Sequence, residues 1–394
     1  MTPLTCQRHE FALPPDVHYL NCAYMGPLPV RSQEAGIAGI RRKAVPTTIS
    51  PDDFFSDSDA ARTLFAAILG AADATRVAIL PAVSYGIAIA ARNLPCRAGQ
   101  RIITAGEQFP SNVYGWRRLA HERGATVVAV PAPEAALEAR SAAIGSRGAR
   151  WNDALADAID ERTAILALPH VHWTDGTRFD LERLAARARD AGAAVVIDAT
   201  QSLGALPFDF QAIRPDAVIC AAYKWLLGPY SVSFGWFGPA FDDGVPLEET
   251  WIGREGSQDF QRLVDYREPY QPGALRYDMG ERSNFIALPM AIESLRLVAG
   301  WGADRVQDYC DALMRQVIDG ARDLGYTVED RSWRGSHLFG LRLPRGTDLD
   351  TLHARLRALN VHASLRGSAL RIAPFAYNDE ADAVALLRAL QPDR

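Results

Sequence analysis

The chain has 394 residues, with 42 basic and 47 acidic residues and a formal net charge of −5 at pH 7. That length is enough for two domains that share a substantial core, and the composition is typical of a globular protein. Charges of both signs are mixed along the chain, so no basic stripe matches a phosphate backbone. We therefore expect no nucleic-acid partner.

The sequence also carries no membrane or secretory signal. The first fifteen residues lack the apolar core of a signal peptide, and no segment approaches the roughly eighteen apolar residues needed to span a bilayer. The five cysteines are scattered and odd in number, which is typical of a reducing compartment and excludes a CxxC site. His170 and His172 lack a third or fourth metal ligand. We expect a cytoplasmic protein with no membrane partner and no metal site.

The first two thirds of the chain predict an α/β fold. Residues 1–18 are proline-rich and without period, which indicates an arm packed on another surface. From about residue 60, helical patterns alternate with short runs rich in Val and Ile, at 76–80, 101–105, 125–130, 164–168, 193–198 and 217–222. The alanine-rich stretch 134–149 predicts helix and loop. Runs that are apolar throughout, with helices between them, predict a mostly parallel sheet covered on both faces.

The tail predicts a second, smaller unit. A passage marked by Pro and Gly lies at 267–273. Beyond it, helices are expected at 284–298, 303–324, 350–358 and 380–390, with strands at 337–343 and 369–375. This mixture predicts an α+β domain of roughly a hundred residues. The predicted organisation is an arm at 1–18, a large domain at 19–270 and a small domain at 271–394.

Polar residues follow several of the apolar runs. In open parallel sheets, ligands bind outside the carboxyl ends of the strands. Ser84 and Gly86 follow the first run and open a helix, whose free amides suit a phosphate; an ordinary serine N-cap is the alternative. Phe109 follows the second run, Asp198 ends the fifth, and Lys224 follows the sixth. A carboxylate or a lysine at the end of a buried strand needs a partner.

Pyridoxal 5'-phosphate explains this set of residues together. The lysine would form a Schiff base with the aldehyde, and the carboxylate would keep the pyridine nitrogen protonated. The aromatic ring can stack on one face of the cofactor, and the phosphate takes the helix N-terminus. We predict this cofactor at the carboxyl edge of the sheet.

The sequence resembles the class V aminotransferase family of fold type I pyridoxal-phosphate enzymes, which includes kynureninase, cysteine desulfurase and isopenicillin N epimerase. The resemblance runs from "YLNCAYMGPLP" at 19–29 to "LRIAPFAYNDEAD" at 370–382. The specific blocks are "EQFPSN", "LPHVHWTDGTRFDL", "VVIDATQSLGALPFD", "AAYKWLLGP" and "LRIAPFAYND". It implies a mostly parallel seven-stranded sheet and a smaller α+β C-terminal domain.

The resemblance also implies roles for single residues. Lys224 would be the Schiff-base lysine and proton shuttle, Asp198 would pair with the pyridine nitrogen, and Arg371 would grip the substrate α-carboxylate. Asn112 and Gln201 would lie near the cofactor O3'. The other implied cofactor contacts are Ser84, Tyr85, Gly86, Phe109, Tyr223, Ser283 and Asn284. The last two lie where relatives complete the partner subunit's phosphate site, so a homodimer with shared active sites is implied. Further substrate-pocket candidates, with structural roles as alternatives, are Tyr24, His172, Trp173 and Trp251.

The reaction stays open at this point, because transamination, elimination, racemisation and kynureninase-type cleavage share their first steps. Residues 364–374 lack the cysteine of persulfide-forming desulfurases, and Asn112 and Gln201 replace residues usual in kynureninase. We expect an enzyme that acts on a small amino acid. Transamination is the preferred hypothesis for its reaction, and a Cα/Cβ lyase or an epimerase is the alternative. A non-catalytic cofactor-binding regulator or scaffold is the alternative of another class. A dehydrogenase is disfavoured because no GxGxxG follows the first run.

Overall fold

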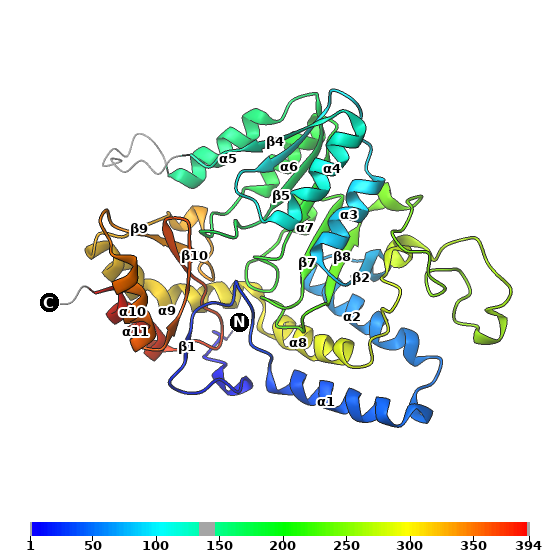
Figure 1. Cartoon of the computed structure of the whole chain (residues 1–394), viewed down its shortest axis with the longest axis horizontal. Coiled ribbons are helices and arrows are strands. Elements are labelled where there is room, and N and C mark those ends of the chain that lie inside the picture. Colours follow the sequence, from blue (N-terminus) through cyan, green and yellow to red (C-terminus); the bar gives the residue numbers. More distant parts are fainter. Residues whose placement is uncertain (1, 134–145, 392–394) are drawn as a thin grey trace.

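A seven-stranded sheet forms the centre of the molecule (Figure 1). The computed structural model describes residues 2–133 and 146–391. The strand order is β2-β8-β7-β6-β5-β3-β4, and every neighbouring pair is parallel except the two that involve β8. The strands are β2 (Val77–Leu80), β3 (Arg101–Ala105), β4 (Thr126–Val130), β5 (Thr163–Pro169), β6 (Ala194–Asp198), β7 (Ala217–Ala221) and β8 (Ser233–Phe237).

The six expected apolar runs are all strands, and the expected α/β class is confirmed. Alternate residues of each strand enter cores on opposite faces of the sheet, as in β2, where Ile79 and Ala78 belong to different clusters. Helices α3 (Val83–Asn93) and α4 (Tyr114–Arg123) cover one face. The other face is covered by α2 (Asp53–Leu69), α5 (Arg147–Ala158), α6 (Leu181–Asp190) and α8 (Ala287–Trp301). A short helix, α7 (Phe210–Ile213), precedes β7.

The alanine-rich stretch 134–149 is described only in part. It was expected to form helix and loop, and residues 134–145 lie outside the described residues. Its last residues begin helix α5, as the pattern predicts.

The C-terminal part is an antiparallel sheet with helices, as expected for the small unit. Its strand order is β12-β13-β10-β9, formed by β12 (Ser364–Arg366), β13 (Ala369–Ile372), β10 (Phe339–Arg342) and β9 (Thr327–Val328). Helices α9 (Ala303–Asp323), α10 (Leu349–Ala358) and α11 (Glu380–Leu390) accompany it. A separate apolar cluster fills this part. The boundary at 270/271 stays a prediction, and helix α8 packs on α1 (Val30–Ala44) and α2.

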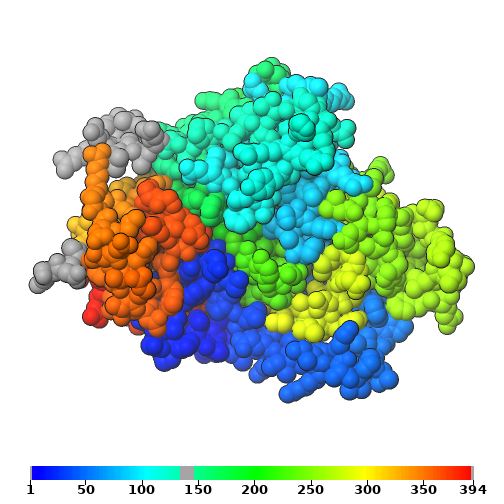
Figure 2. All heavy atoms as spheres, in the orientation of Figure 1, coloured from blue at the N-terminus to red at the C-terminus, as the bar shows by residue number. Residues whose placement is uncertain are grey.

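The N-terminal residues pack against the C-terminal part, which Figure 2 shows as dark blue against orange and red. Strand β1 (His18–Tyr19) pairs in parallel with β11 (Val361–His362). The Gln7 amide donates to the Ala376 carbonyl at 2.7 Å. The Phe11 ring contacts the ring of Tyr377 edge-on at 5.2 Å. This segment therefore fixes the C-terminal sheet beside the ends of the central strands.

Candidate active site

A cavity of about 330 Å³ opens at the carboxyl ends of the central strands. Strands β5, β6 and β7 are neighbours, so their last residues lie at one edge. The predicted residues that line the cavity are Ser84, Phe109, Trp173, Asp198, Gln201, Tyr223 and Lys224. The structure therefore brings together seven residues that are spread over 140 positions of the sequence, from Ser84 to Lys224.

Lys224 lies in the turn after β7 and is 7% exposed. Its Nζ is 5.6 Å from the centroid of the Phe109 ring and 5.5 Å from that of Tyr223. Across the described residues, no carboxylate lies within ion-pair distance of this amine. Burial lowers the pKa of the amine to about 8, while the charge of Asp198 acts in the opposite direction and that of Arg371 in the same one.

Asp198 is the last residue of β6 and is 8% exposed. Its Oδ1 accepts a hydrogen bond from the Thr200 amide at 3.0 Å, and its Oδ2 lies 3.5 Å from Asn112 Nδ2. Burial raises the pKa of this carboxyl, and the Thr200 hydrogen bonds oppose that rise. Two hydrogen bonds leave a carboxylate with acceptor capacity to spare, so a cationic group in the cavity would find a partner here.

The start of helix α3 forms another wall. Residues 81–84 line the cavity, and the first amides of a helix have no helical partners. The N-cap residue is Ala82 and makes no side-chain cap, so the alternative of Ser84 as an ordinary N-cap is wrong. A Cβ at Gly86 would meet Ile219 Cγ2 at 2.8 Å, which means that Gly86 lets the helix approach β7. Tyr85, which was expected to contact the cofactor, lies beside Glu248 and does not line the cavity.

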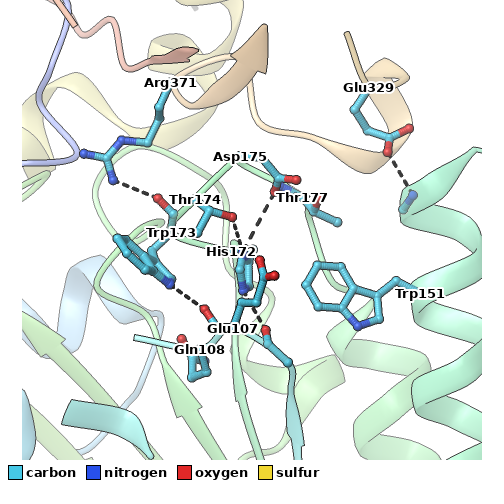
Figure 3. Close-up of polar contacts among 12 residues, drawn as sticks. Glu107, Gln108, Trp151, His172, Trp173, Thr174, Asp175, Thr177, Glu329 and Arg371 are labelled. Atoms are coloured by element: carbon cyan, nitrogen blue, oxygen red, sulfur yellow. Dashed lines mark hydrogen bonds and ion pairs between the residues drawn. The ribbon is translucent and has the colours of Figure 1, made fainter. Parts of the chain in front are cut away.

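Phe109 and Trp173 form an aromatic wall. Their rings meet edge-to-face with centroids 5.5 Å apart. The Trp173 indole donates to the Glu107 carbonyl at 2.7 Å, which fixes the ring (Figure 3). Trp173 therefore lines the cavity, as expected, and its contact with a substrate stays a prediction.

His172 points away from the cavity, which corrects its assignment to the substrate pocket. It is fully buried, and its ring lies 4.9 Å from that of Trp151. Its Nδ1 is 2.7 Å from Thr174 Oγ1 and its Nε2 is 3.1 Å from the Gly106 carbonyl (Figure 3). Successive side chains of an extended segment point to opposite sides, so Val171 and Trp173 line the cavity and His172 does not.

Arg371 lies on β13 and reaches the central part of the molecule. Its Nη1 donates to the Trp173 carbonyl at 2.7 Å, and its Nη2 lies 3.4 Å from Asn21 Oδ1. The residue is 1% exposed, and its Nε is buried with no hydrogen-bond partner in the described part of the chain. Burial and the charge of Arg366 lower the pKa of this guanidinium to about 10. No carboxylate among the described residues pairs with this buried cation, which therefore suits an anionic ligand.

Comparison with known proteins agrees with this geometry. The family model for class V aminotransferases matches residues 52–239. An uncharacterized aminotransferase of Bacillus subtilis, YcbU, is 25% identical over 319 residues, covering 81% of this chain and 79% of that protein. Kynureninase of Pseudomonas fluorescens is 29% identical over 287 residues, which is 69% of this chain and 63% of that enzyme. A solved cystine C–S lyase in complex with cysteine persulfide has a TM-score of 0.80 at 19% identity, covering 95% and 97% of the two chains.

Residues 52–239 therefore resemble class V aminotransferase-type enzymes. The predicted fold type I is confirmed, and the matches agree with the predicted family and its pyridoxal 5'-phosphate cofactor. The cavity fits that cofactor. It offers a buried amine, a buried carboxylate with free acceptor sites, an exposed ring face and the amides of a helix start.

Four further predicted residues also lie outside this cavity. Ser283 donates its hydroxyl to the Phe54 carbonyl. Asn284 accepts from the Ala287 amide at 2.8 Å at the start of α8. Trp251 packs in an aromatic cluster with Phe54, and Tyr24 is 57% exposed. The roles of Ser283 and Asn284 in a partner's site stay predictions, as do the homodimer and the substrate-pocket roles of Trp251 and Tyr24.

Some site residues stay predictions and others carried no prediction. Asn112 lies beside Asp198, and Gln201 lines the cavity and donates to the Ala23 carbonyl at 3.1 Å, so their expected places near the cofactor O3' stay predictions. Thr200 was missed, although its position two residues after Asp198 is typical of an Asx turn. Cavity residues without a sequence signal are Gln108, Val171, Tyr230, Ser231 and Ser233, and Asn21 beside Arg371 is another.

Proposed function

We propose that this enzyme uses pyridoxal 5'-phosphate, held at Lys224 and Asp198, to transaminate a small amino acid. The observation that supports it most is that Lys224 and Asp198 lie on one cavity at the ends of neighbouring strands, with Arg371 close enough to affect the Lys224 pKa. When bound, the cofactor supplies an aldehyde that joins covalently to an amine and a ring that draws electrons from the substrate α-carbon.

The residues of the chain would divide the work. Arg371 would bind the substrate α-carboxylate, since a guanidinium offers two parallel donors to a carboxylate. The Trp173 carbonyl, which accepts from Arg371, would orient that guanidinium. Lys224 Nζ, with its lowered pKa, would accept the proton from the α-carbon and hold it close to where it was removed. Asp198 would carry the negative charge that stabilises a positive ring nitrogen.

A lyase acting at Cα/Cβ or at a C–S bond is the second candidate. The kynureninase match and the fold shared with a cystine C–S lyase favour it. A persulfide-forming mechanism with a cysteine nucleophile finds no support, because none of the five cysteines lines the cavity and four of them are buried. Epimerisation remains an alternative outcome of the test below.

The test is spectral. The purified holoenzyme should be yellow, Lys224→Ala should lose the covalently bound chromophore, and an amino donor should bleach the wild type with formation of a 2-oxo acid. Mass spectrometry identifies the carbon product. Release of ammonia and pyruvate from a donor other than alanine, with the yellow colour retained, would contradict transamination and support elimination. Bound cofactor without turnover of any amino acid would instead support a regulatory or scaffold protein.

A further inference from the structure

One face of the C-terminal sheet presents three arginines to the loop at residues 171–178. In the register of this sheet, Arg371 is opposite Ser364 on β12 and Gly340 on β10, while Ala369 is opposite Arg366 and Arg342. Directly opposite residues point to the same face of a sheet, and so do residues two apart on one strand. Arg342, Arg366 and Arg371 therefore share one face.

Only one of these three cations has a carboxylate partner among the described residues. Arg342 Nη2 lies 2.5 Å from Asp175 Oδ2. Arg371 instead donates to the Trp173 carbonyl, and Arg366 donates to the carbonyl of its neighbour Leu365 at 2.9 Å. Among the described residues, the Nε atoms of Arg366 and Arg371 are both buried without a hydrogen-bond partner. Arg371 is buried and Arg366 is half-buried, so two neighbouring guanidinium groups lack an anionic partner within the part of the chain that the structure describes.

Trp173 connects both cations to the cavity. Its ring lines the cavity wall, its carbonyl accepts from Arg371, and the Arg366 guanidinium lies 5.9 Å from the ring centroid. The charge of Arg366 acts on the pKa of Arg371, and that of Arg371 acts on the pKa of Lys224. Arg371 is therefore close to both Lys224 and Arg366, and Arg366 itself lies on β12.

We infer that the amino-acid substrate is dicarboxylic, with its α-carboxylate on Arg371 and its side-chain carboxylate on Arg366. The inference rests on the proposed function, because it takes the amino-acid site as given. A single α-carboxylate would neutralise one guanidinium and leave the other without a counter-ion. An amino acid of the aspartate or glutamate class carries the second anion at its other end. Each carboxylate can accept two hydrogen bonds from a planar guanidinium.

The competing interpretation is that Arg366 only covers the Trp173 ring. Cation–π contacts of this kind occur on many proteins and contribute to stability without a ligand. This interpretation predicts that loss of the Arg366 charge has the same effect on every ligand. The inference predicts an effect on dicarboxylic ligands alone, so the two can be separated by comparing ligands of equal length.

The experiment measures binding of unreactive acids to the holoenzyme by titration calorimetry. We expect succinate and glutarate to bind at least about tenfold more tightly than butyrate and valerate, since hydrogen bonds to charged groups are the stronger class. Arg366→Leu should remove this preference and leave butyrate binding unchanged. Arg388→Leu is the matched control, because it removes an exposed arginine from α11 of the same part of the chain. It should keep the preference.

Other results would overturn the inference. Equal binding of mono- and dicarboxylic acids by the wild type would do so, as would an Arg366→Leu variant that weakens butyrate and succinate alike. Reaction with alanine is followed in parallel by absorbance. Bleaching by alanine without a dicarboxylate preference would reject only the dicarboxylic substrate. Absence of any spectral response to alanine, aspartate or glutamate would reject the proposed function and this inference with it.

Discussion

The environment of Lys224 decides how its amine behaves. Burial removes water that would stabilise the ammonium form, and it lowers the pKa from its ordinary value to about 8. The negative charge of Asp198 opposes this shift, and the positive charge of Arg371 adds to it. A neutral amine attacks aldehydes and accepts protons, whereas an ammonium group does neither. A large fraction of this amine is therefore neutral near pH 8.

This environment predicts how cofactor uptake depends on pH. The rate at which apoprotein takes up pyridoxal 5'-phosphate, followed by visible absorbance, should rise with pH through a midpoint near 8. Asp198→Asn removes a charge that raises the Lys224 pKa, so its midpoint should be lower. Arg371→Leu removes a charge that lowers it, so its midpoint should be higher. Midpoints that stay near 10.5, or that move the same way in both variants, would contradict this account.

The loop at residues 171–178 joins the catalytic edge of the central sheet to the C-terminal sheet. Asp175 binds Arg147 Nη1 at 2.7 Å and also Arg342 of β10 (Figure 3 labels Asp175). Gly176 has a φ of +76°, and a Cβ there would lie 2.1 Å from the Leu338 carbonyl. The same loop carries Trp173 and its bond to Arg371. It therefore holds Arg371 in register with the cavity.

Removing the charge of Asp175 should loosen this connection. Asp175→Asn leaves the guanidinium groups of Arg147 and Arg342 without their anion. Removing one partner of a buried ion pair lowers the free energy of unfolding by about 3–5 kcal/mol, and we expect a loss of this size. The KM for the amino donor should rise more than kcat falls, because the change reaches Arg371 through Trp173. Chemical denaturation and steady-state kinetics measure the two effects.

The matched control for this variant is Asp153→Asn. Its carboxylate binds Arg183 at 2.8 Å on the surface, so the expected loss is at most about 1 kcal/mol with unchanged KM. If both variants lose the same stability and keep the same KM, the loop does not link the two sheets as described.

The molecule as a whole carries features that its own cavity does not use. The segment at residues 247–270 projects from the side opposite the C-terminal sheet (Figure 1). It exposes 90% of Tyr266 and 41% of Trp251. Within the described residues, no helix combines the length and apolarity needed to cross a bilayer. The proposed homodimer would give the aromatic groups a covering surface and would bring Trp251 to the site of a second copy.

Mixing two impaired variants tests this shared site. Lys224→Ala and Trp251→Ala should each be strongly impaired alone. After joint refolding, half of the dimers are mixed and one of their two sites is intact, so about a quarter of the wild-type activity should return. Sedimentation velocity should show a particle of twice the 43.0 kDa chain. A monomer, or a mixture no more active than its parts, would reject the shared site.

Much of the fold and half of the site follow from local sequence. The six Val- and Ile-rich runs predict the strands because buried parallel strands need apolar residues on both faces. The antiparallel β8 was not placed, since "SFGWF" at 233–237 lies close behind β7 without a helical crossover. His172 was misplaced because its direction depends on the extended backbone after β5. Ser283, Asn284 and Trp251 have roles that one chain alone does not test.

By itself, the sequence determined the α/β class and the placement of Lys224 and Asp198 at one edge of the sheet, because the carboxyl ends of adjacent parallel strands lie together. The family resemblance pointed to Arg371, and only the tertiary structure showed that Arg366 lies beside it. The register of the small sheet puts Arg366 and Arg371 on one face, and the 171–178 loop brings that face to Trp173. Such contacts join residues almost two hundred positions apart, so no local pattern of apolar or polar residues encodes them.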